Sequence, residues 1–160
     1  MTHLTTGKKA PAFKGIDQAG HVRELKSYLG KKLLIYFYPK DDTPACTAQA
    51  CDLRDNYKKL IKAGYQVIGI SPDEVKRHVK FISKYDLPFD LISDPEHKIA
   101  EKYGVWGEKT LYGRKYMGII RTSFLLDEKG KITEIIEKVD TKNHSAQVLK
   151  TEAKESKNKA

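Results

Sequence analysis

The chain has 160 residues and a formal net charge of +9, with 30 lysine and arginine residues against 21 acidic ones. This length suits one domain with a single hydrophobic core. Its two cysteines are too few for a disulfide framework. The amino terminus lacks the apolar core of a signal peptide, and no apolar run approaches the length of a membrane span. We therefore expect a cytoplasmic protein without a membrane partner.

The excess of positive charge raises the question of nucleic-acid binding. The lysines are spread along the chain, several of them in the polar segment 151–160, and no nucleic-acid-binding motif accompanies them. We interpret the charge as solvated surface and expect no specific nucleic-acid partner. A basic nucleic-acid-binding module remains the weaker alternative.

Turn-forming and apolar segments alternate along the chain. We expect a short hairpin over residues 12–24, and one helical turn over residues 25–29 that Gly30 closes. Apolar runs predict further strands at residues 32–38, 65–70, 89–92, 121–126 and 131–139. Capping residues and helical periodicity predict helices at residues 44–62, 71–84, 95–102 and 143–149. Residues 104–118 have no clean period and predict a long loop that contains at most a short strand.

The predicted helix over residues 71–84 has the clearest start signal. Ser71 and Glu74 have the spacing of a capping box. We expect Val75, Val79 and Ile82 to face the core, which would leave His78 in solvent.

Strands that alternate with helices, followed by a hairpin and a closing helix, indicate an α/β fold. We expect a mixed central sheet with helices on both faces and a short hairpin at the amino terminus. Residues 1–150 would form the single domain, and residues 151–160 a disordered polar tail.

Thr43 and Pro44 mark the start of the helix that carries both cysteines. The Thr43 hydroxyl can accept a hydrogen bond from a first-turn amide, and proline is well suited to the first helical position. Cys46 then lies in the first turn, where unpaired amides and the helix dipole stabilise a thiolate. Because the thiolate is the nucleophilic form, we interpret Cys46 as a reactive cysteine.

Cys51 lies five residues further along the same predicted helix. An intact helix would hold the two α-carbons roughly 8 to 9 Å apart, whereas a disulfide needs about 7 Å or less. A disulfide would therefore require the helix to unwind, and it would suit a transient catalytic bond. Two inert core cysteines are the alternative. We expect no metal site, because no histidine lies within motif spacing of the pair.

The spacing of Pro39, Thr43 and Cys46 resembles the active-site pattern of the peroxiredoxins, which are thiol peroxidases. The position of Cys51 in the same helix is similar to the peroxiredoxin Q branch, also called bacterioferritin comigratory protein. The resemblance continues through residues 103–109, 118–127 and 142–144.

This resemblance implies a thioredoxin-like fold and the reduction of hydrogen peroxide and alkyl hydroperoxides, without a cofactor, in antioxidant defence. It implies that Cys46 is the peroxidatic cysteine and forms a sulfenic acid. Cys51 would resolve the sulfenic acid as an intramolecular disulfide, and thioredoxin would reduce that disulfide in a monomeric enzyme. Many relatives have glycine where this chain has Ala45, so the helix should unwind less readily here.

The resemblance also implies roles for residues around the sulfur. Arg121 would hold the thiolate and the peroxide, and the Thr43 hydroxyl would donate toward them. Pro39 would shield the pocket. Gln49, one turn along the helix, is a weaker candidate for a supporting polar contact.

A protein thiol-disulfide oxidoreductase is the main alternative function, because such enzymes also combine two cysteines with a thioredoxin-like fold. They typically use a Cys-x-x-Cys motif. Cys46 and Cys51 are separated by four residues, which favours the peroxidase.

Overall fold

The computed structural model describes residues 2–150, so the predicted tail over residues 151–160 lies outside the described residues. The strands are β1 Lys14–Ile16, β2 Val22–Glu24, β3 Lys32–Phe37, β4 Tyr65–Ser71, β5 Asp90–Ser93, β6 Trp106–Leu111, β7 Arg114–Ile119, β8 Thr122–Leu126 and β9 Ile132–Ile136. The helices are η1 Leu25–Ser27, α1 Pro44–Asp55, α2 Tyr57–Lys62, α3 Val75–Tyr85 and α4 Lys98–Lys102, and residues 144–150 are also helical.

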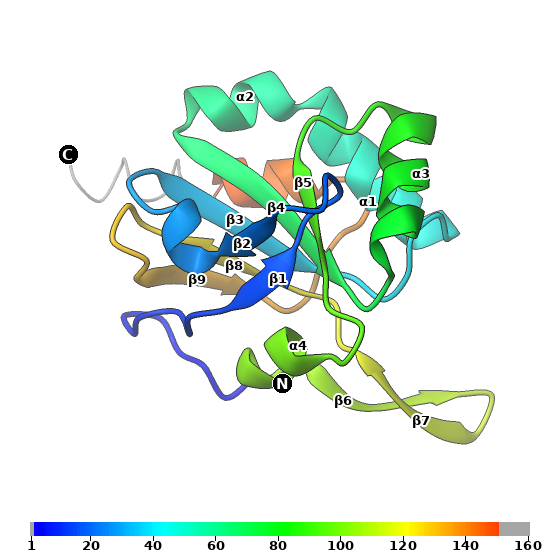
Figure 1. The fold of residues 1–160 in the computed structure, drawn as a ribbon. Helices are drawn as coiled ribbons and strands as arrows, with labels where there is room; N and C mark the ends of the chain where they lie inside the picture. Colours follow the sequence, from blue (N-terminus) through cyan, green and yellow to red (C-terminus); the bar gives the residue numbers. More distant parts are fainter. Residues whose placement is uncertain (1, 151–160) are drawn as a thin grey trace.

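Seven strands form one mixed sheet in the order β2-β1-β5-β4-β3-β8-β9 (Figure 1). The three inner strands β3, β4 and β5 are parallel, whereas β8 and β1 join them antiparallel. Side chains 33 to 38 along β3 and just beyond it are all fully buried, and successive ones enter two separate core clusters. A strand buried on both faces reads as a continuous apolar run, so this strand was predictable.

Helices cover both faces of the sheet. On one face, α1, α2, α3 and residues 144–150 contribute Leu53, Leu60, Phe81 and Val148 to the core. On the other face, α4 and η1 pack together with the segment before β1. Burial of each large apolar side chain contributes roughly 1.5 to 3 kcal/mol. The predicted mixed sheet with helices on both faces is confirmed.

Close packing at Gly69 in β4 holds the ring of Tyr36 in β3. A Cβ atom at Gly69 would lie 2.8 Å from Cζ of Tyr36 and 2.9 Å from Cδ2 of Leu91. Only glycine therefore lets the Tyr36 ring approach β4 this closely.

Several predicted elements are confirmed. β1 and β2 form the amino-terminal hairpin, η1 is the predicted helical turn, and β8 and β9 form the predicted strand pair. The closing helix is present at residues 144–150.

The predicted single helix over residues 44–62 is interrupted at Asn56. This residue has φ −110° and ψ 15°, outside the helical range, and separates α1 from α2. The side-chain amide of Asn56 donates to the carbonyl of Asp52 at 2.9 Å. Such a local side-chain bond competes with the helical backbone and ends α1 there.

The predicted long loop over residues 104–118 was wrong, because the hairpin β6–β7 forms there and projects from the molecule (Figure 1). Its turn contains Tyr112 and Gly113 with φ of 51° and 78°. Two residues with positive φ are typical of a tight hairpin turn. Side chains on both sides of the hairpin are exposed, so its sequence lacks the alternation that marks a half-buried strand.

The start predicted for α3 was also wrong, and its buried face was only partly right, because Ile82 packs against the core as predicted. Ser71 belongs to β4, and its hydroxyl donates to Asp73 rather than accepting from a helical amide. The helix starts at Val75. His78 is fully buried, whereas Val79 is 47% exposed. His78 can be buried because its ring forms a hydrogen bond with the carboxylate of Asp41.

Candidate active site

Cys46 lies in the first turn of α1, which begins at Pro44 as predicted. Thr43 precedes the helix in an extended conformation, but the predicted side-chain cap was wrong. The Thr43 hydroxyl instead donates to the carbonyl of Lys40 at 2.9 Å. Helical geometry leaves the amides of Ala45 and Cys46 without an intrahelical acceptor, so they can face negative charge at the sulfur.

Arg121 contacts the sulfur of Cys46 although 75 residues separate them in sequence. One guanidinium nitrogen, Nη2, donates to Sγ at 3.3 Å, and Nη1 donates to Oε1 of Gln49 at 2.6 Å. Arg121 immediately precedes β8, which pairs with β3, and this pairing brings the guanidinium to the carboxyl end of β3. A cation at this position stabilises the thiolate over the thiol. The fold thus brings Cys46, Gln49 and Arg121 together.

Two buried polar atoms near the cysteine have no hydrogen-bond partner among residues 2–150. They are the hydroxyl of Tyr36 and Nε2 of Gln49. Burial raises the pKa of Tyr36 well above its usual value, and the charges of Asp41 and Cys46 add to this effect. The hydroxyl therefore keeps its proton and remains a donor. Of the two, Gln49 is the one tied to the site, because its Oε1 accepts from Arg121.

Tyr36 was missed at the sequence level, because it lies inside an apolar run and reads as a core residue. Its only signal was a polar hydroxyl in a stretch, residues 33–37, whose other positions are aliphatic or aromatic.

Lys109 of β6 is a second basic group near the sulfur. Burial lowers the pKa of Lys109 below its usual value, the Arg121 cation acts in the same direction, and Cys46 opposes both. Its ammonium donates to the carbonyl of Ile119 at 2.9 Å, which holds it beside the end of β7. No pattern in the sequence distinguishes Lys109 from the many other lysines of the chain.

Cys51 is half-buried on α1, and both cysteines are free thiols. Nearby on α1, the hydrogen bond to Asp55 raises the pKa of Arg54, and burial opposes this effect. With α1 intact, the two sulfurs cannot bond without unwinding the helix. Pro39 is half-buried at the end of β3. The roles of Thr43 and Pro39 in the chemistry remain predictions.

Comparisons with known proteins agree with this geometry. Residues 6–135 match the model of the AhpC/TSA family. A putative peroxiredoxin bcp from Haemophilus influenzae is 48% identical over 149 residues, covering 93% of this chain and 96% of that protein. Peroxiredoxin Bcp from Escherichia coli is 46% identical over 149 residues, with the same coverage of 93% and 96%.

Solved structures show the same likeness. Bacterioferritin comigratory protein of Xanthomonas campestris has a TM-score of 0.86 at 32% identity, covering 94% of this chain and 99% of that one. A peroxiredoxin Q mutant from Xylella fastidiosa has a TM-score of 0.89 at 26% identity, covering 96% and 98%.

The sheet and the arginine-bound cysteine define a peroxiredoxin with a thioredoxin-like fold. The chain belongs to the AhpC/TSA family, in its peroxiredoxin Q or bacterioferritin comigratory protein branch. It is a thiol peroxidase, an enzyme that reduces peroxides with a thiol reductant. Within residues 2–150, no helix is long and apolar enough to cross a bilayer.

Proposed function

We propose that Cys46 reduces hydrogen peroxide and alkyl hydroperoxides. The Cys46 thiolate attacks one peroxide oxygen, the oxygen–oxygen bond breaks, and the second oxygen takes a proton and leaves as water or alcohol. Cys46 is oxidised to a sulfenic acid. The observation that carries this proposal is the 3.3 Å bond from Nη2 of Arg121 to Sγ of Cys46, at the start of α1. Alkyl peroxide reduction by the bacterioferritin comigratory protein of Xanthomonas campestris supports the same chemistry here.

Donors around the sulfur would stabilise the transition state, in which negative charge spreads over sulfur and both oxygens. Arg121 supplies a full positive charge, and the amides of Ala45 and Cys46 supply partial charges. The unpaired amide nitrogen of Gln49, whose Oε1 is held by Arg121, supplies a neutral donor.

The second half of the cycle uses Cys51. Its thiol attacks the sulfenic sulfur of Cys46, a sulfur–sulfur bond forms, and the sulfenic oxygen leaves as water. An external dithiol then reduces this disulfide by thiol exchange and is itself oxidised. We propose thioredoxin as that dithiol.

We also propose that residues 1–150 act as one domain in a cytoplasmic monomer. The single seven-stranded sheet supports the first part of this proposal. Two free cysteines suit a reducing compartment, where a disulfide is usually transient.

Stoichiometric titration tests this function. The reduced protein is mixed with increasing hydrogen peroxide or an alkyl hydroperoxide, and the peptides are analysed by mass spectrometry. We expect one peroxide lost per chain and one disulfide between Cys46 and Cys51. If reduced protein instead cleaved insulin disulfides and consumed no peroxide, the thiol-disulfide oxidoreductase would be the better assignment.

A further inference from the structure

Asp41 is a buried acid in the loop over residues 39–43, which leads from β3 into α1. It is only 2% exposed, and all of its polar groups have partners. Oδ1 accepts from the hydroxyl of Tyr38 at 2.5 Å, and the backbone amide donates to Oδ2 of Asp73 at 2.8 Å. The carbonyl accepts from Nη2 of Arg77 at 3.4 Å. Asp41 therefore ties the loop before Cys46 to the body of the domain.

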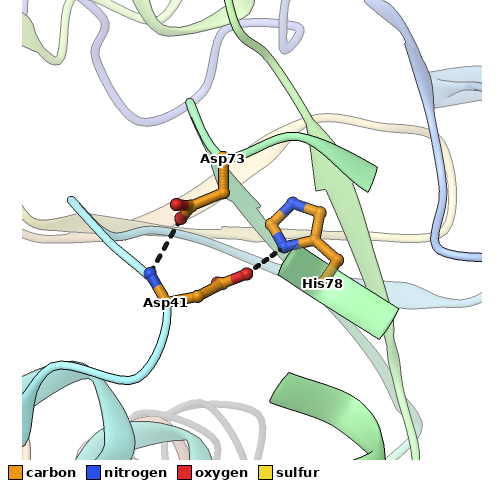
Figure 2. A group of neighbouring side chains, drawn as sticks. All are labelled: Asp41, Asp73 and His78. Atoms are coloured by element: carbon orange, nitrogen blue, oxygen red, sulfur yellow. Dashed lines mark hydrogen bonds and ion pairs between the residues drawn. The ribbon is translucent and has the colours of Figure 1, made fainter. Parts of the chain in front are cut away.

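His78 of α3 completes this arrangement, as Figure 2 shows. The side chain is fully buried, with Nδ1 at 2.6 Å from Oδ2 of Asp41 and Nε2 at 3.3 Å from the carbonyl of Ile92. Both ring nitrogens thus face oxygen atoms, so hydrogen bonding holds the ring on two sides. Removing either partner would leave the other buried without compensation, which is strongly destabilising.

The same residues have the spacing of a metal site, since ligand atoms of Asp41, Asp73 and His78 lie within 4.8 Å of one another. The candidate ligand atoms already take part in hydrogen bonds within the protein, however. Oδ2 of Asp73 accepts from the amide of Asp41 and from the hydroxyl of Ser71, and Oδ1 accepts from Nε of Arg77 at 3.0 Å. A guanidinium on the carboxylate disfavours a bound cation. The cluster is better understood as a hydrogen-bond network.

We propose that His78 is a positioning residue for the peroxidatic cysteine. Its bond to Asp41 fixes residues 39–43, and thereby favours the helical first turn of α1 over the unwound form that lets Cys51 reach Cys46. This inference rests on the proposed peroxidase cycle. The helical form reacts with peroxide and the unwound form makes the disulfide, so the pair sets the balance between the two steps.

A second contact between the same loop and the same helix provides a matched control. Asp42 accepts from Lys84 and from the hydroxyl of Tyr85, both at 2.8 Å, but these groups lie at the surface. Exposed ion pairs contribute little to stability. Lys84→Ala should therefore leave the loop and the peroxidase activity close to those of the wild type.

The test compares the wild type, His78→Leu, the double variant Asp41→Asn/His78→Leu, and Lys84→Ala. In His78→Leu, amide hydrogen exchange at residues 47–50 of the reduced protein, the first amides with helical acceptors, should speed up about tenfold, and kcat/KM for peroxide should fall about tenfold. At high peroxide, a smaller fraction of Cys46 should become sulfinic acid, because the disulfide forms sooner. In the double variant each change should be smaller than in His78→Leu. The reason is that the neutral asparagine side chain at position 41 leaves no unpaired charge in the interior.

The proposal would be overturned if His78→Leu kept both the wild-type exchange rate at residues 47–50 and the wild-type ratio of disulfide to sulfinic acid. If His78→Leu does not fold, the double variant carries the test. Smaller changes in the same direction support the proposal, and wild-type values contradict it. If the wild type consumed no peroxide, the proposed function would fail, while amide exchange would still test the positioning role.

Discussion

Asp52 of α1 accepts a hydrogen bond from the backbone amide of Ser145, with 2.7 Å between Oδ2 and the amide nitrogen. Ser145 lies in the first turn of the helix over residues 144–150. Asp52 therefore caps that helix from a different element, and it is the residue directly after Cys51. Unwinding α1 to join the cysteines should loosen this cap, which couples the closing helix to the redox state.

Replacing Asp52 should test this coupling. We expect Asp52→Ala to lower the free energy of unfolding by about 1 kcal/mol, measured with urea, because a helix cap is lost. In the wild type, amides of residues 144–150 should exchange faster in the disulfide form than in the dithiol form. Asp55→Ala, which removes a surface partner of Arg54, is the control. Equal protection in both redox states would contradict the coupling.

Replacement of Cys46 and replacement of Cys51 should stop peroxide reduction at different steps. Cys46→Ser should abolish peroxide consumption, since the nucleophile is gone. Cys51→Ser should consume about one peroxide per chain and then stop, leaving a sulfenic acid that a dimedone probe traps. Repeated turnover of Cys51→Ser with thioredoxin would show that Cys51 is not the resolving cysteine.

Arg121→Ala should reduce kcat/KM for peroxide by about 100- to 1000-fold, the usual effect of removing one preorganised donor from a transition state. The thiolate absorbance of Cys46 at neutral pH should fall as well, because Sγ loses its charged donor. Arg114→Ala, on the exposed hairpin β6–β7, removes the same charge away from the site. Unchanged thiolate absorbance in Arg121→Ala would refute the electrostatic role of Arg121.

Ala45→Gly should speed disulfide formation. Glycine is less favourable in a helix than alanine by up to about 1 kcal/mol, and this difference lowers the cost of unwinding the first turn of α1. We expect the step from sulfenic acid to disulfide to quicken by up to about fivefold, followed by rapid quenching and thiol alkylation. Ala146→Gly makes the same change in an exposed position of the helix over residues 144–150 and should leave this rate unchanged.

His144 should make stability depend on pH. It is fully buried, with Nε2 2.8 Å from the hydroxyl of Ser123 and Nδ1 2.8 Å from Oε1 of Gln147. Burial lowers the pKa of His144 below 6.5, against the opposing hydrogen bond to Gln147. The folded state thus binds a proton less readily than the unfolded state, and stability should fall as pH drops below about 6.5.

Urea unfolding at pH 8 and at pH 5.5 measures this effect. His144→Gln should lose this part of the pH dependence while staying folded. A wild-type pH dependence in that variant would assign the effect to other groups.

The parts of the fold that could be predicted from the sequence have local signals. The apolar run of β3 and the proline at the start of α1 each carry their own evidence, so Cys46 could be placed in a first turn. The contact of Arg121 with Cys46 spans 75 residues and depends on the pairing of β8 with β3, so only the family resemblance indicated it.

His78 shows why the rest could not be predicted. The spacing of Val75, Val79 and Ile82 suggested one apolar face, but a neighbouring face carries His78 and Phe81. The partner that makes burial of His78 favourable, Asp41, lies 37 residues earlier in the chain. Helical periodicity takes account only of the residues of one helix. It therefore counts histidine as polar even where a carboxylate from another segment is its hydrogen-bond partner.

The interruption at Asn56 limits how far the redox change can spread. The backbone amide of Leu60 in α2 donates to the carbonyl of Asn56 at 3.1 Å, and Leu60 is fully buried. α2 therefore keeps its own anchorage when the first turns of α1 lose their helical form. The change in each catalytic round would stay within α1, and α2 would remain folded beside it until reduction restores the helix.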